Sequence, residues 1–472
     1  MVKCNQNGYT KDNRLTKVIK KRRMFMEQSR EQWGTRWGFI LAAAGSAIGL
    51  GNIWRFPYLA GENGGAAFII IYILCVIFIG LPLMLAEFMI GRRGGGDAVQ
   101  SFRNIAPGKR WFVAGGIGVL AAFVILTYYG VVAGWALKYF LAYLTGGLWS
   151  PPADGFESYF LSFIASPLEP IVWQAVMMAL TIGVVIFGIK GGIEKASLFL
   201  MPLLGLLVII LAIYGVSLEG SNQGLSFLFN PDWSSFADPK VYVAALGQMF
   251  FSLSLGMGIM LTYGSYINPT IRLPQSAGTI VTFDTIFAIL AGLMIFPALF
   301  AFGGNPGQGP GLLFITMPDV FASMGSFGIV IGLLFFLLVV IAALTSMISL
   351  LEVSTAYFMR KLSLDRKKTT LLVGIIIFIL GIPSSLGNGP WGHITLLPDK
   401  AILDTLDYIA NSFLLPISGV LSVLFVGWAW KKEEVLRESQ LASRRLVSLL
   451  IWLLRIPVPI LILVILVSMA TG

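Results

Sequence analysis

Two glycine-rich segments interrupt apolar stretches of the chain and carry groups that could bind an ion or a small polar ligand. The first is Gly45–Asn52 (GSAIGLGN) and the second is Ser252–Gly258 (SLSLGMG). Glycine lowers helix stability by about 1 kcal/mol relative to alanine, so several glycines close together favour local unwinding. Unwound backbone at membrane depth is tolerated only where it is buried in protein or lines a cavity. Backbone carbonyl and N–H groups are free of the helical ladder there. Together with the neighbouring hydroxyl and amide side chains, they can bind a cation or a carboxylate.

Long apolar helices must hold these segments, because the composition is that of a membrane protein. Of the 472 residues, 57% are hydrophobic and only 12% are charged, whereas soluble domains contain roughly 25% charged residues. Since a membrane-spanning helix needs about 20 mostly apolar residues, we predict an all-α integral membrane protein with about 11 transmembrane helices. Their predicted ranges are 36–60, 66–91, 111–144, 169–188, 193–216, 241–268, 276–303, 327–359, 369–384, 402–430 and 446–470.

The two glycine-rich segments lie in the first and the sixth predicted helices, so each opens a group of five helices. Small residues also serve close helix packing. Breaks at corresponding places of two halves are nevertheless typical of an inverted repeat with a binding site at its centre. The predicted organisation is a cytoplasmic basic tail (1–35), a first five-helix repeat (36–216), an outer loop (217–240), a second, inverted repeat (241–430), and a cytoplasmic loop with the eleventh helix (431–472).

The uneven distribution of lysine and arginine sets the expected orientation. Most of these 33 residues fall in the tail 1–35 and in alternate loops, whereas the intervening loops hold only Lys240 and Lys400. Positively charged loops stay in the cytoplasm, so we expect a cytoplasmic N-terminus and, after an odd number of spans, an extracellular C-terminus. The net charge of +10 then reflects topology, and the expected surroundings are membrane lipid rather than nucleic acid.

Few side chains are available for enzymatic chemistry. His393 is the single histidine, and Cys4 and Cys75 are the two cysteines. These counts exclude Cys/His zinc clusters, histidine-based triads and a disulfide framework, so an intramembrane enzyme is disfavoured and no catalytic residue is expected. Glu87 lies within the second predicted helix, where a charge is usually functional. It is expected either to accept N–H groups freed by the second break or to form an ordinary interhelical hydrogen bond.

Five motifs make the chain resemble a known family. They are Gly45–Pro57 (GSAIGLGNIWRFP), Glu62–Phe68 (ENGGAAF), Tyr128-Tyr129, Gln248–Gly258 (QMFFSLSLGMG) and Ala342–Ser346 (AALTS). From Arg30 to the tenth predicted helix the chain resembles the neurotransmitter:sodium symporter family, and within it the bacterial multi-hydrophobic amino-acid and leucine transporters. The family pattern has twelve spans, and bacterial members are known to tolerate the loss of one. The loop 145–168 is short and has no glycosylation sequon, which favours a prokaryotic plasma membrane.

The resemblance implies two sodium ions, each held only by oxygen ligands. The first sodium site is formed by Ala47, Asn52, Ser252 and Asp284, and is completed by the substrate carboxylate. The second sodium site is formed by Gly45, Ile48, Ala342, Thr345 and Ser346. Without the resemblance, the hydroxyl groups of Thr345 and Ser346 would be expected to hydrogen-bond to the preceding helical turn.

The resemblance also implies a substrate site at the same breaks. Its residues are Ala47, Leu50, Gly51, Ile125, Tyr129, Phe251, Ser252, Ser254, Met257, Ser346, Ser349 and Leu350. A helix that begins near Leu50 offers free N–H groups and positive potential to a carboxylate. Relatives that carry amines have an aspartate where this chain has Gly49, so an α-amino acid is expected. Because a charged side chain would be costly to bury unpaired in this pocket, we expect hydrophobic and aromatic L-amino acids.

The resemblance implies gates on both sides of the substrate site. Arg55 and Asp407 match an outer ion pair of the family, and an intramembrane arginine is usually functional. Arg30 matches the arginine of the inner gate. The acidic partner that the family places after the eighth helix is Arg360 here, so we expect Glu352, two turns earlier, to substitute for it.

Asp284 determines whether transport is expected to require chloride in addition to sodium. Chloride-dependent relatives have asparagine at this position and bind an anion in a pocket to which Tyr72, Gln248 and Ser252 correspond. Asp284 would itself supply the negative charge, so no chloride requirement is expected. Burial favours the neutral carboxyl group and sodium favours its ionised form. The empty carrier is therefore expected to return protonated, which would export a proton in each cycle.

The function implied by the resemblance is sodium-coupled import of hydrophobic and aromatic L-amino acids by alternating access, with no obligatory protein partner. Two alternatives stay open, a substrate-gated channel and an amino-acid sensor that does not transport. Counterflow of labelled substrate into preloaded vesicles separates a carrier from a channel, because a channel shows no trans-stimulation.

Overall fold

The fold is known from a computed structural model that describes residues 31–306, 311–398 and 400–471. These residues form helices and connecting turns, and their one β-type contact is an isolated bridge between Leu397 and Lys400. The all-α prediction is therefore confirmed. The predicted tail 1–35, including Arg30, lies almost entirely outside the described residues.

Every predicted span coincides with helix. Within the described residues, eight helices are long and apolar enough to cross a membrane, or up to ten if two bent pairs each count as one span. The elements in the predicted ranges are α2 (Arg36–Ala47), η1 (Gly51–Arg55) and α3 (Phe56–Glu62); α4 (Ala66–Cys75), η2 (Val76–Gly80) and α5 (Leu81–Gly94); α7 (Phe112–Thr145); α9 (Glu169–Val185); η3 (Ile189–Ile193) and α10 (Glu194–Ser217); α12 (Pro239–Ser252) and α13 (Ile259–Ser265); α14 (Leu273–Ala301); α16 (Ser326–Leu362); α17 (Arg366–Leu386); α18 (Ile402–Ile409), η6 (Ala410–Leu414), α19 (Leu415–Leu424) and η7 (Phe425–Ala429); α21 (Arg444–Arg455) and α22 (Pro457–Thr471).

Shorter helices lie in the connections. They are α6 (Ala98–Ile105), α8 (Gly155–Ala165), α11 (Asn222–Phe229), η4 (Trp233–Ala237), η5 (Leu312–Thr316), α15 (Met317–Ser323) and α20 (Lys432–Ser439). The eleventh predicted helix is divided at Ile456, because Pro457 cannot continue the hydrogen-bond ladder of α21 and instead opens α22.

The first glycine-rich segment breaks its span as predicted. Helix α2 ends at Ala47, and Ile48 is extended, with φ −78° and ψ 95°. The chain then resumes helically as η1, whose axis, continued by α3, is bent by 46° from that of α2. Backbone groups on both sides of the break are thereby freed from the helical ladder.

The second break separates α12 from α13. Gly256 has φ +75° and Gly258 has φ +73°, a region that suits glycine. A Cβ atom on Gly256 would lie 2.3 Å from the carbonyl oxygen of Leu415, so the close approach also requires glycine. The freed N–H group of Gly256 donates to Oε1 of Glu87 at 2.9 Å. The first of the two roles expected for Glu87 is confirmed.

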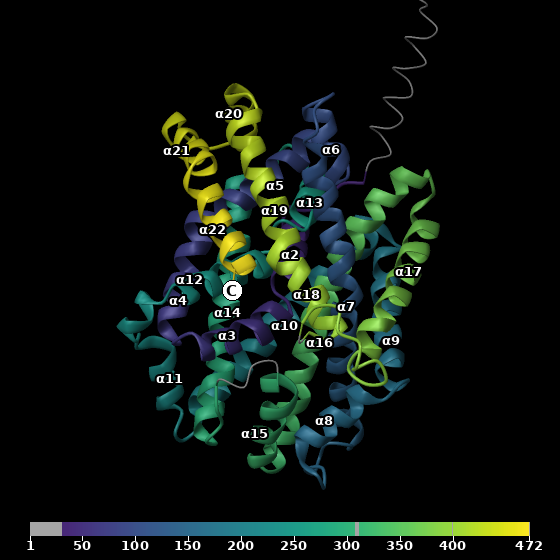
Figure 1. The fold of residues 1–472 in the computed structure, drawn as a ribbon, viewed down its shortest axis with the longest axis vertical. Coiled ribbons are helices and arrows are strands. Elements are labelled where there is room, and N and C mark those ends of the chain that lie inside the picture. The colour runs from purple at the N-terminus through teal and green to yellow at the C-terminus, as the bar shows by residue number, and fades with distance from the viewer. Residues whose placement is uncertain (1–30, 307–310, 399, 472) are drawn as a thin grey trace, which may run out of the picture.

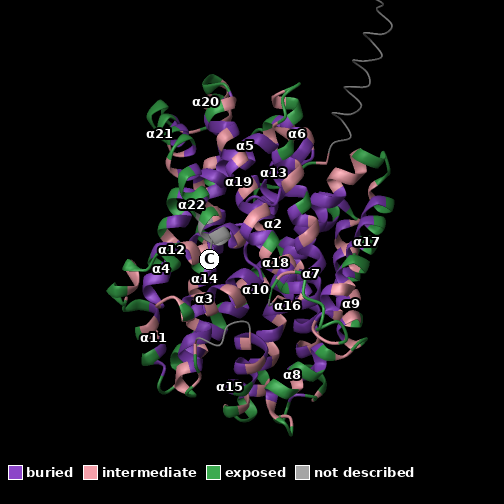
Figure 2. Ribbon diagram, in the orientation of Figure 1, coloured by how far each residue is buried: buried purple, intermediate pink, exposed green. Residues whose placement is uncertain are grey.

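The helices pack around these two breaks. Helix α16 lies along α7, and α10 lies along α14 (Figure 1). Buried residues fill the interior, while exposed residues lie on the outside and at the two ends (Figure 2). Many exposed side chains are large and apolar, such as Phe187, Phe199 and Ile213, as expected for a surface that faces lipid.

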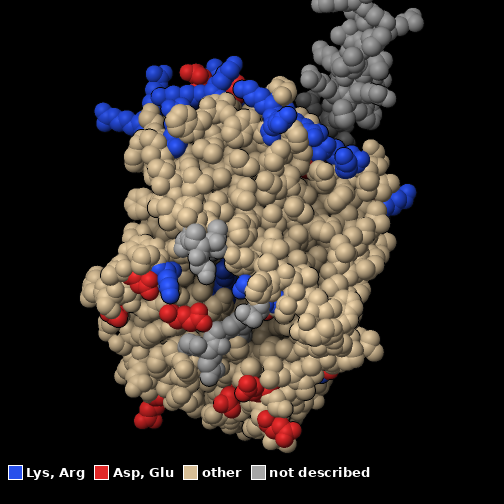
Figure 3. All heavy atoms as spheres, viewed as in Figure 1, with Lys and Arg blue, Asp and Glu red and all other residues tan. Residues whose placement is uncertain are grey.

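Charged residues gather at one end of the molecule, and an uncharged band separates them from the charged residues of the other half (Figure 3). In the face shown in Figure 3, lysine and arginine line the end that carries α6, α20 and α21, whereas acidic residues dominate the opposite end. We call the first of these the basic end. Its position agrees with the loop charges from which the orientation was predicted.

Candidate functional site

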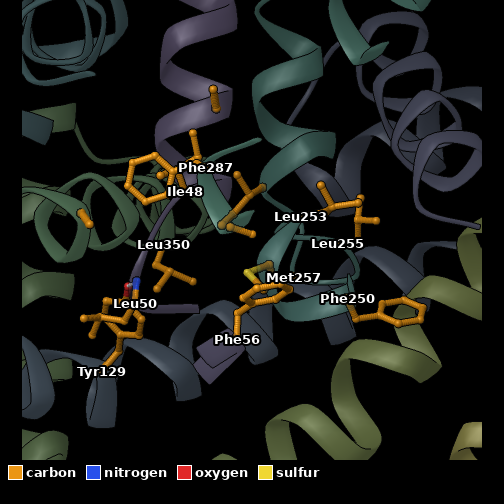
Figure 4. Packing of buried hydrophobic residues seen from close by; sticks show 14 of the residues in the cluster. Ile48, Leu50, Phe56, Tyr129, Phe250, Leu253, Leu255, Met257, Phe287 and Leu350 are labelled. Atoms are coloured by element: carbon orange, nitrogen blue, oxygen red, sulfur yellow. Dashed lines mark hydrogen bonds between the residues drawn. The ribbon is translucent and has the colours of Figure 1, made fainter. Parts of the chain in front are cut away.

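A small central cavity lies between the two helix breaks. Every predicted substrate-binding residue lines it except Leu50 and Ser252. The lining residues are Ser46, Ala47, Gly49, Gly51, Ile125, Tyr129, Phe251, Ser254, Met257, Ile259, Ser346, Ser349 and Leu350. Figure 4 shows Leu350, Met257 and Tyr129 among the buried side chains near the breaks. Among the residues that the structure describes, the cavity wall contains no charged side chain.

Tyr129 connects α7 to the first break. The N–H group of Leu50 donates to the Tyr129 hydroxyl oxygen at 3.1 Å, so both groups stand at the start of the second half-helix. Leu50 itself lines the neighbouring outer cavity instead of the central one. Gly49 was missing from the predicted set. A Cβ atom there would lie 2.3 Å from Oγ of Ser346 and 3.0 Å from Oη of Tyr129, so this wall of the cavity has no room for a side chain.

Three serine hydroxyl groups form the polar part of the cavity wall. Ser46 Oγ donates to Ser254 Oγ at 3.0 Å and lies 2.7 Å from Ser349 Oγ. Ser254 and Ser349 in turn donate to the carbonyl groups of Ser46 and Ser346. Ser346 and Tyr129 add two further hydroxyl groups, and the large apolar side chains of the wall are Ile125, Phe251, Met257, Ile259 and Leu350. A ligand with an apolar body and a small polar tip fits this distribution.

Three of the four residues assigned to the first sodium site, Asn52, Ser252 and Asp284, are brought together around a buried carboxylate. Asn52 Nδ2 donates to Asp284 Oδ1 at 2.8 Å, and Ser252 Oγ lies 2.9 Å from both carboxylate oxygens. Tyr72 donates to Asp284 Oδ2 at 3.0 Å. These oxygen atoms are the ligands that a hard cation prefers. Ala47 lies at the adjoining end of α2.

The residues assigned to the second sodium site also converge. Gly45 approaches α16 so closely that a Cβ atom on it would lie 3.4 Å from Cβ of Thr345. Ser346 Oγ donates to the carbonyl oxygen of Ser46 at 3.2 Å. Thr345 Oγ1 lies 3.0 Å from the carbonyl oxygen of Ala342. Ile48 is the extended residue that follows α2. Thr345 thus bonds to the preceding turn and also faces the break.

The outer gate residues share a second cavity above Phe251 and Tyr129. This outer cavity is lined by both Arg55 and Asp407. The two do not form the expected ion pair. Arg55 instead lies over the Phe251 ring, 5.2 Å from its centroid, and Asp407 accepts a hydrogen bond from Asn411 at 2.7 Å. The two gate residues therefore face the same cavity without a direct ion pair.

Ion pairs that were not predicted from the sequence lie at the inner side. Glu352 was expected to pair with Arg30, which lies outside the described residues. Both Glu352 oxygens instead bind Arg366, at 2.6 and 3.0 Å, and Oε1 also accepts from Tyr266 at 2.7 Å. The same arginine binds Glu31 at 2.6 and 2.8 Å. Arg366 reaches Glu352 because the start of α17 lies against the end of α16, and the predicted pair of Glu352 with Arg30 stays a prediction.

Two further acidic residues fix the inner side. Arg360, at the end of α16, pairs with Asp97. Glu194, at the start of α10, accepts from the Gly34 N–H group at 2.7 Å and from the Thr35 hydroxyl at 2.8 Å. Glu194 thereby holds the segment that leads into α2. Sequence reasoning missed Arg366, Asp97 and Glu194, because ion pairs between helix ends leave no periodic signal.

Comparisons with known proteins agree with this architecture. The family model described as "Sodium:neurotransmitter symporter family" matches residues 30–154 and 149–471. An uncharacterized sodium-dependent transporter of Bacillus subtilis, YhdH, is 39% identical over 446 residues, which cover 94% of this chain and 98% of the relative. An uncharacterized sodium-dependent transporter of Haemophilus influenzae is 36% identical over 457 residues, covering 93% and 98%.

Among solved structures, that of MhsT in complex with L-phenylalanine is similar to this chain with a TM-score of 0.88. The two sequences are 53% identical, and the match covers 93% of this chain and all of MhsT. The fold, the two broken spans and the sequence relatives therefore lead to one assignment. The chain belongs to the sodium:neurotransmitter symporter family of multi-pass membrane transporters, and it is a sodium-coupled carrier, not an enzyme.

Proposed function

We propose that the chain imports hydrophobic and aromatic L-amino acids together with sodium by alternating access. The observation that carries the proposal is the uncharged central cavity at the junction of two helix breaks and a buried Asp284 cluster. The phenylalanine named in the MhsT structure supports an amino-acid substrate.

The cavity offers separate surroundings to the three parts of an amino acid. N–H groups at the start of the half-helix near Leu50 and Gly51 suit the carboxylate, beside the Tyr129 hydroxyl. The carbonyl groups of Ala47, Phe251 and Ser254 suit the ammonium group. The aliphatic and serine-lined wall receives the side chain, and the serine hydroxyls favour tryptophan and tyrosine, whose N–H and O–H groups need a partner when buried.

Two sodium ions are proposed to travel with each substrate. The first is bound by Ala47, Asn52, Ser252 and Asp284, with the substrate carboxylate as a further ligand. The second is bound by Gly45, Ile48, Ala342, Thr345 and Ser346. Both sets contain only oxygen ligands and lie at the breaks, where carbonyl groups are free of the helical ladder.

Transport is proposed to need no chloride and to export a proton. Asp284 already places a carboxylate against Tyr72 and Ser252, two of the three residues of the family's anion pocket. The third, Gln248, donates its amide to the Gly51 carbonyl oxygen at 2.7 Å. An anion added there would meet a like charge in a buried site, which is unfavourable.

The chain is proposed to lie in a prokaryotic plasma membrane with its N-terminus in the cytoplasm and its C-terminus outside. The basic end then faces the cytoplasm, as positively charged loops do. The Arg366 ion pairs at the inner side are proposed to belong to an inner-closed state. Alternation requires the Arg366 ion pairs to break and the outer cavity to close.

Purified protein in liposomes tests the proposal. Uptake of labelled amino acids is measured for all twenty candidates under inward sodium, lithium or potassium gradients. We expect sodium-driven uptake of tryptophan, phenylalanine, tyrosine and leucine, and counterflow into preloaded vesicles. Asn52→Leu should abolish uptake, whereas Asn230→Leu, in an outer connection, should retain it. Sodium-independent uptake, equal competition by lysine or glutamate, or binding without uptake would each overturn the proposal.

A further inference from the structure

Polar side chains follow one face of α16 inward from the proposed second sodium site. Thr345, Ser349 and Glu352 follow one another at intervals of four and three residues, and Thr355 comes three residues later. Residues at such intervals lie on the same side of a helix. All four are buried. Glu352 therefore lies about 10.5 Å further inward than Thr345 along the helix axis.

Hydroxyl groups connect the central cavity to Glu352. Ser349 lines the cavity, and its hydroxyl group also hydrogen-bonds to Tyr263. Tyr266, directly after α13, donates to Oε1 of Glu352 at 2.7 Å. The Thr355 hydroxyl group has no hydrogen-bond partner within the described ranges, although the residue is fully buried. Polar atoms thus continue past Glu352 toward the inner side, and one of them is available to a ligand.

One guanidinium group serves two carboxylates at this place. Arg366 forms two hydrogen bonds with Glu352, at 2.6 and 3.0 Å, and two with Glu31, at 2.6 and 2.8 Å. In the described part of the chain, no second lysine or arginine pairs with either carboxylate. The three side chains therefore combine one positive charge with two negative charges, and a further cation is electrostatically favoured beside them.

The two carboxylates belong to parts of the molecule that alternating access would separate. Glu31 precedes α2 and the first break, whereas Glu352 lies on α16. A guanidinium group cannot bind both once α2 moves away. Arg366 is the first residue of α17, and its bonds to Glu31 are as short as those to Glu352, so it can leave with Glu31. A buried carboxylate that loses its partner is strongly destabilised, which favours another cation at Glu352.

We propose that Glu352 binds the second sodium ion transiently on its way to the cytoplasm. While the inner side is closed, Arg366 occupies the carboxylate. After inward opening, the ion that leaves the second sodium site takes the place of the guanidinium group, with the Tyr266 and Thr355 hydroxyls as further oxygen ligands. Carboxylate and hydroxyl oxygens are ligands that hard cations prefer. This release site rests on the proposed function, because it requires two sodium ions and alternating access.

A release site differs from a simple closing contact in its effect on sodium. If the Arg366–Glu352 pair only closed the inner side, loss of either partner would change the response to cytoplasmic sodium in the same direction. If Glu352 binds sodium, loss of the carboxylate lowers the affinity for cytoplasmic sodium, because the ion loses an attracting charge. Loss of the arginine raises that affinity, because a competing cation is removed.

Inhibition of uptake by internal sodium measures this affinity. Right-side-out membrane vesicles that contain the full-length chain are loaded with increasing sodium concentrations, and the initial uptake of labelled tryptophan is followed at constant external sodium. We expect Glu352→Gln to raise the half-inhibitory internal sodium concentration by about tenfold, and Arg366→Gln to lower it by about tenfold. The control Lys367→Gln removes a neighbouring exposed charge and should leave the value unchanged.

A double variant separates the carboxylate from the ion pair. Glu352→Gln/Arg366→Gln removes both charges and should behave as Glu352→Gln, and it also serves where a single variant fails to fold. Sodium-dependent binding of substrate shows that each variant is folded. Shifts in the same direction in both single variants, an unchanged value in Glu352→Gln, or a double variant that follows Arg366→Gln would overturn the release site and leave the proposed function intact. Absence of sodium-driven uptake by the unaltered protein would overturn the proposed function and the release site with it.

Discussion

Arg366 and Glu352 are joined by two hydrogen bonds, from Nη1 at 2.6 Å and from Nη2 at 3.0 Å, at the inner side of the molecule. The Glu352 side chain is fully buried, and Arg366 is 12% exposed. The same guanidinium group binds Glu31, which precedes α2. One arginine therefore connects α16 and α17 to the segment that leads into the first broken span.

Removal of this arginine should open the inner side. In Arg366→Gln, Glu352 loses its ionic partner, and breaking a buried ion pair typically costs about 3–5 kcal/mol. We expect alkylation of a cysteine placed at Ser265, in a background without Cys4 and Cys75, to accelerate by about tenfold or more. Lys367→Gln removes an exposed neighbouring charge and should leave the rate unchanged. Equal rates in the two variants would contradict a closing role for Arg366.

A side chain at Gly49 should damage the substrate site. In Gly49→Ala the new Cβ atom would have to displace Oγ of Ser346, 2.3 Å away, in a wall that also holds Tyr129. We expect substrate affinity, measured by scintillation proximity, to fall by about tenfold or more. Gly116→Ala is the matched control, because a Cβ atom there meets nothing within 4 Å, and it should bind normally. Normal binding by Gly49→Ala would show that Ser346 lies outside the site.

The spans and both breaks could be predicted from sequence because they depend on local composition. Apolar length defines each helix, and the glycines of Gly45–Asn52 and Ser252–Gly258 mark the places where the helical ladder fails. The Glu87 contact was also foreseeable, because the glycines predicted unpaired N–H groups close to an intramembrane acid. The cavity residues came from family resemblance and not from periodicity.

The ion pairs could not be predicted in the same way. Arg366 binds Glu352 because the end of α16 lies against the start of α17, and the sequence carries no signal for that contact. Arg55 and Asp407 line one cavity without pairing, although the family resemblance implied an ion pair. Such contacts are set by tertiary geometry and conformational state.

The acceptor at Glu87 should support the second break. Glu87→Ala would leave the Gly256 N–H group buried without a partner, which typically costs about 1–3 kcal/mol. We expect a lower melting temperature in a thermal-shift assay and weaker substrate binding. Glu87→Gln keeps a carbonyl oxygen that can accept the same hydrogen bond and should restore most of the stability. Equal destabilisation by both variants would indicate that the charge, and not the acceptor, is required.

Asn52 should couple sodium to substrate. It donates to Asp284 and is proposed to bind the sodium that also touches the substrate carboxylate. Asn52→Leu should therefore weaken sodium binding and substrate binding together. By linkage, the factor by which sodium raises substrate affinity equals the factor by which substrate raises sodium affinity, so both factors should fall equally. Titration of each ligand at several fixed concentrations of the other measures this factor. Loss of one affinity with the other intact would exclude shared coordination.

Asp284 should decide the anion requirement and the proton coupling. Uptake by the unaltered protein should persist in chloride-free gluconate and be stimulated by an acidic vesicle interior, because a protonated Asp284 lets the empty carrier return. Asp284→Asn removes the fixed charge against Tyr72 and Ser252, so the effect of internal pH should disappear and external chloride should increase any remaining uptake. Asp319→Asn, at an exposed position of α15, should behave as the unaltered protein. A chloride requirement in the unaltered protein, or an internal-pH effect that survives in Asp284→Asn, would show that another group carries the charge.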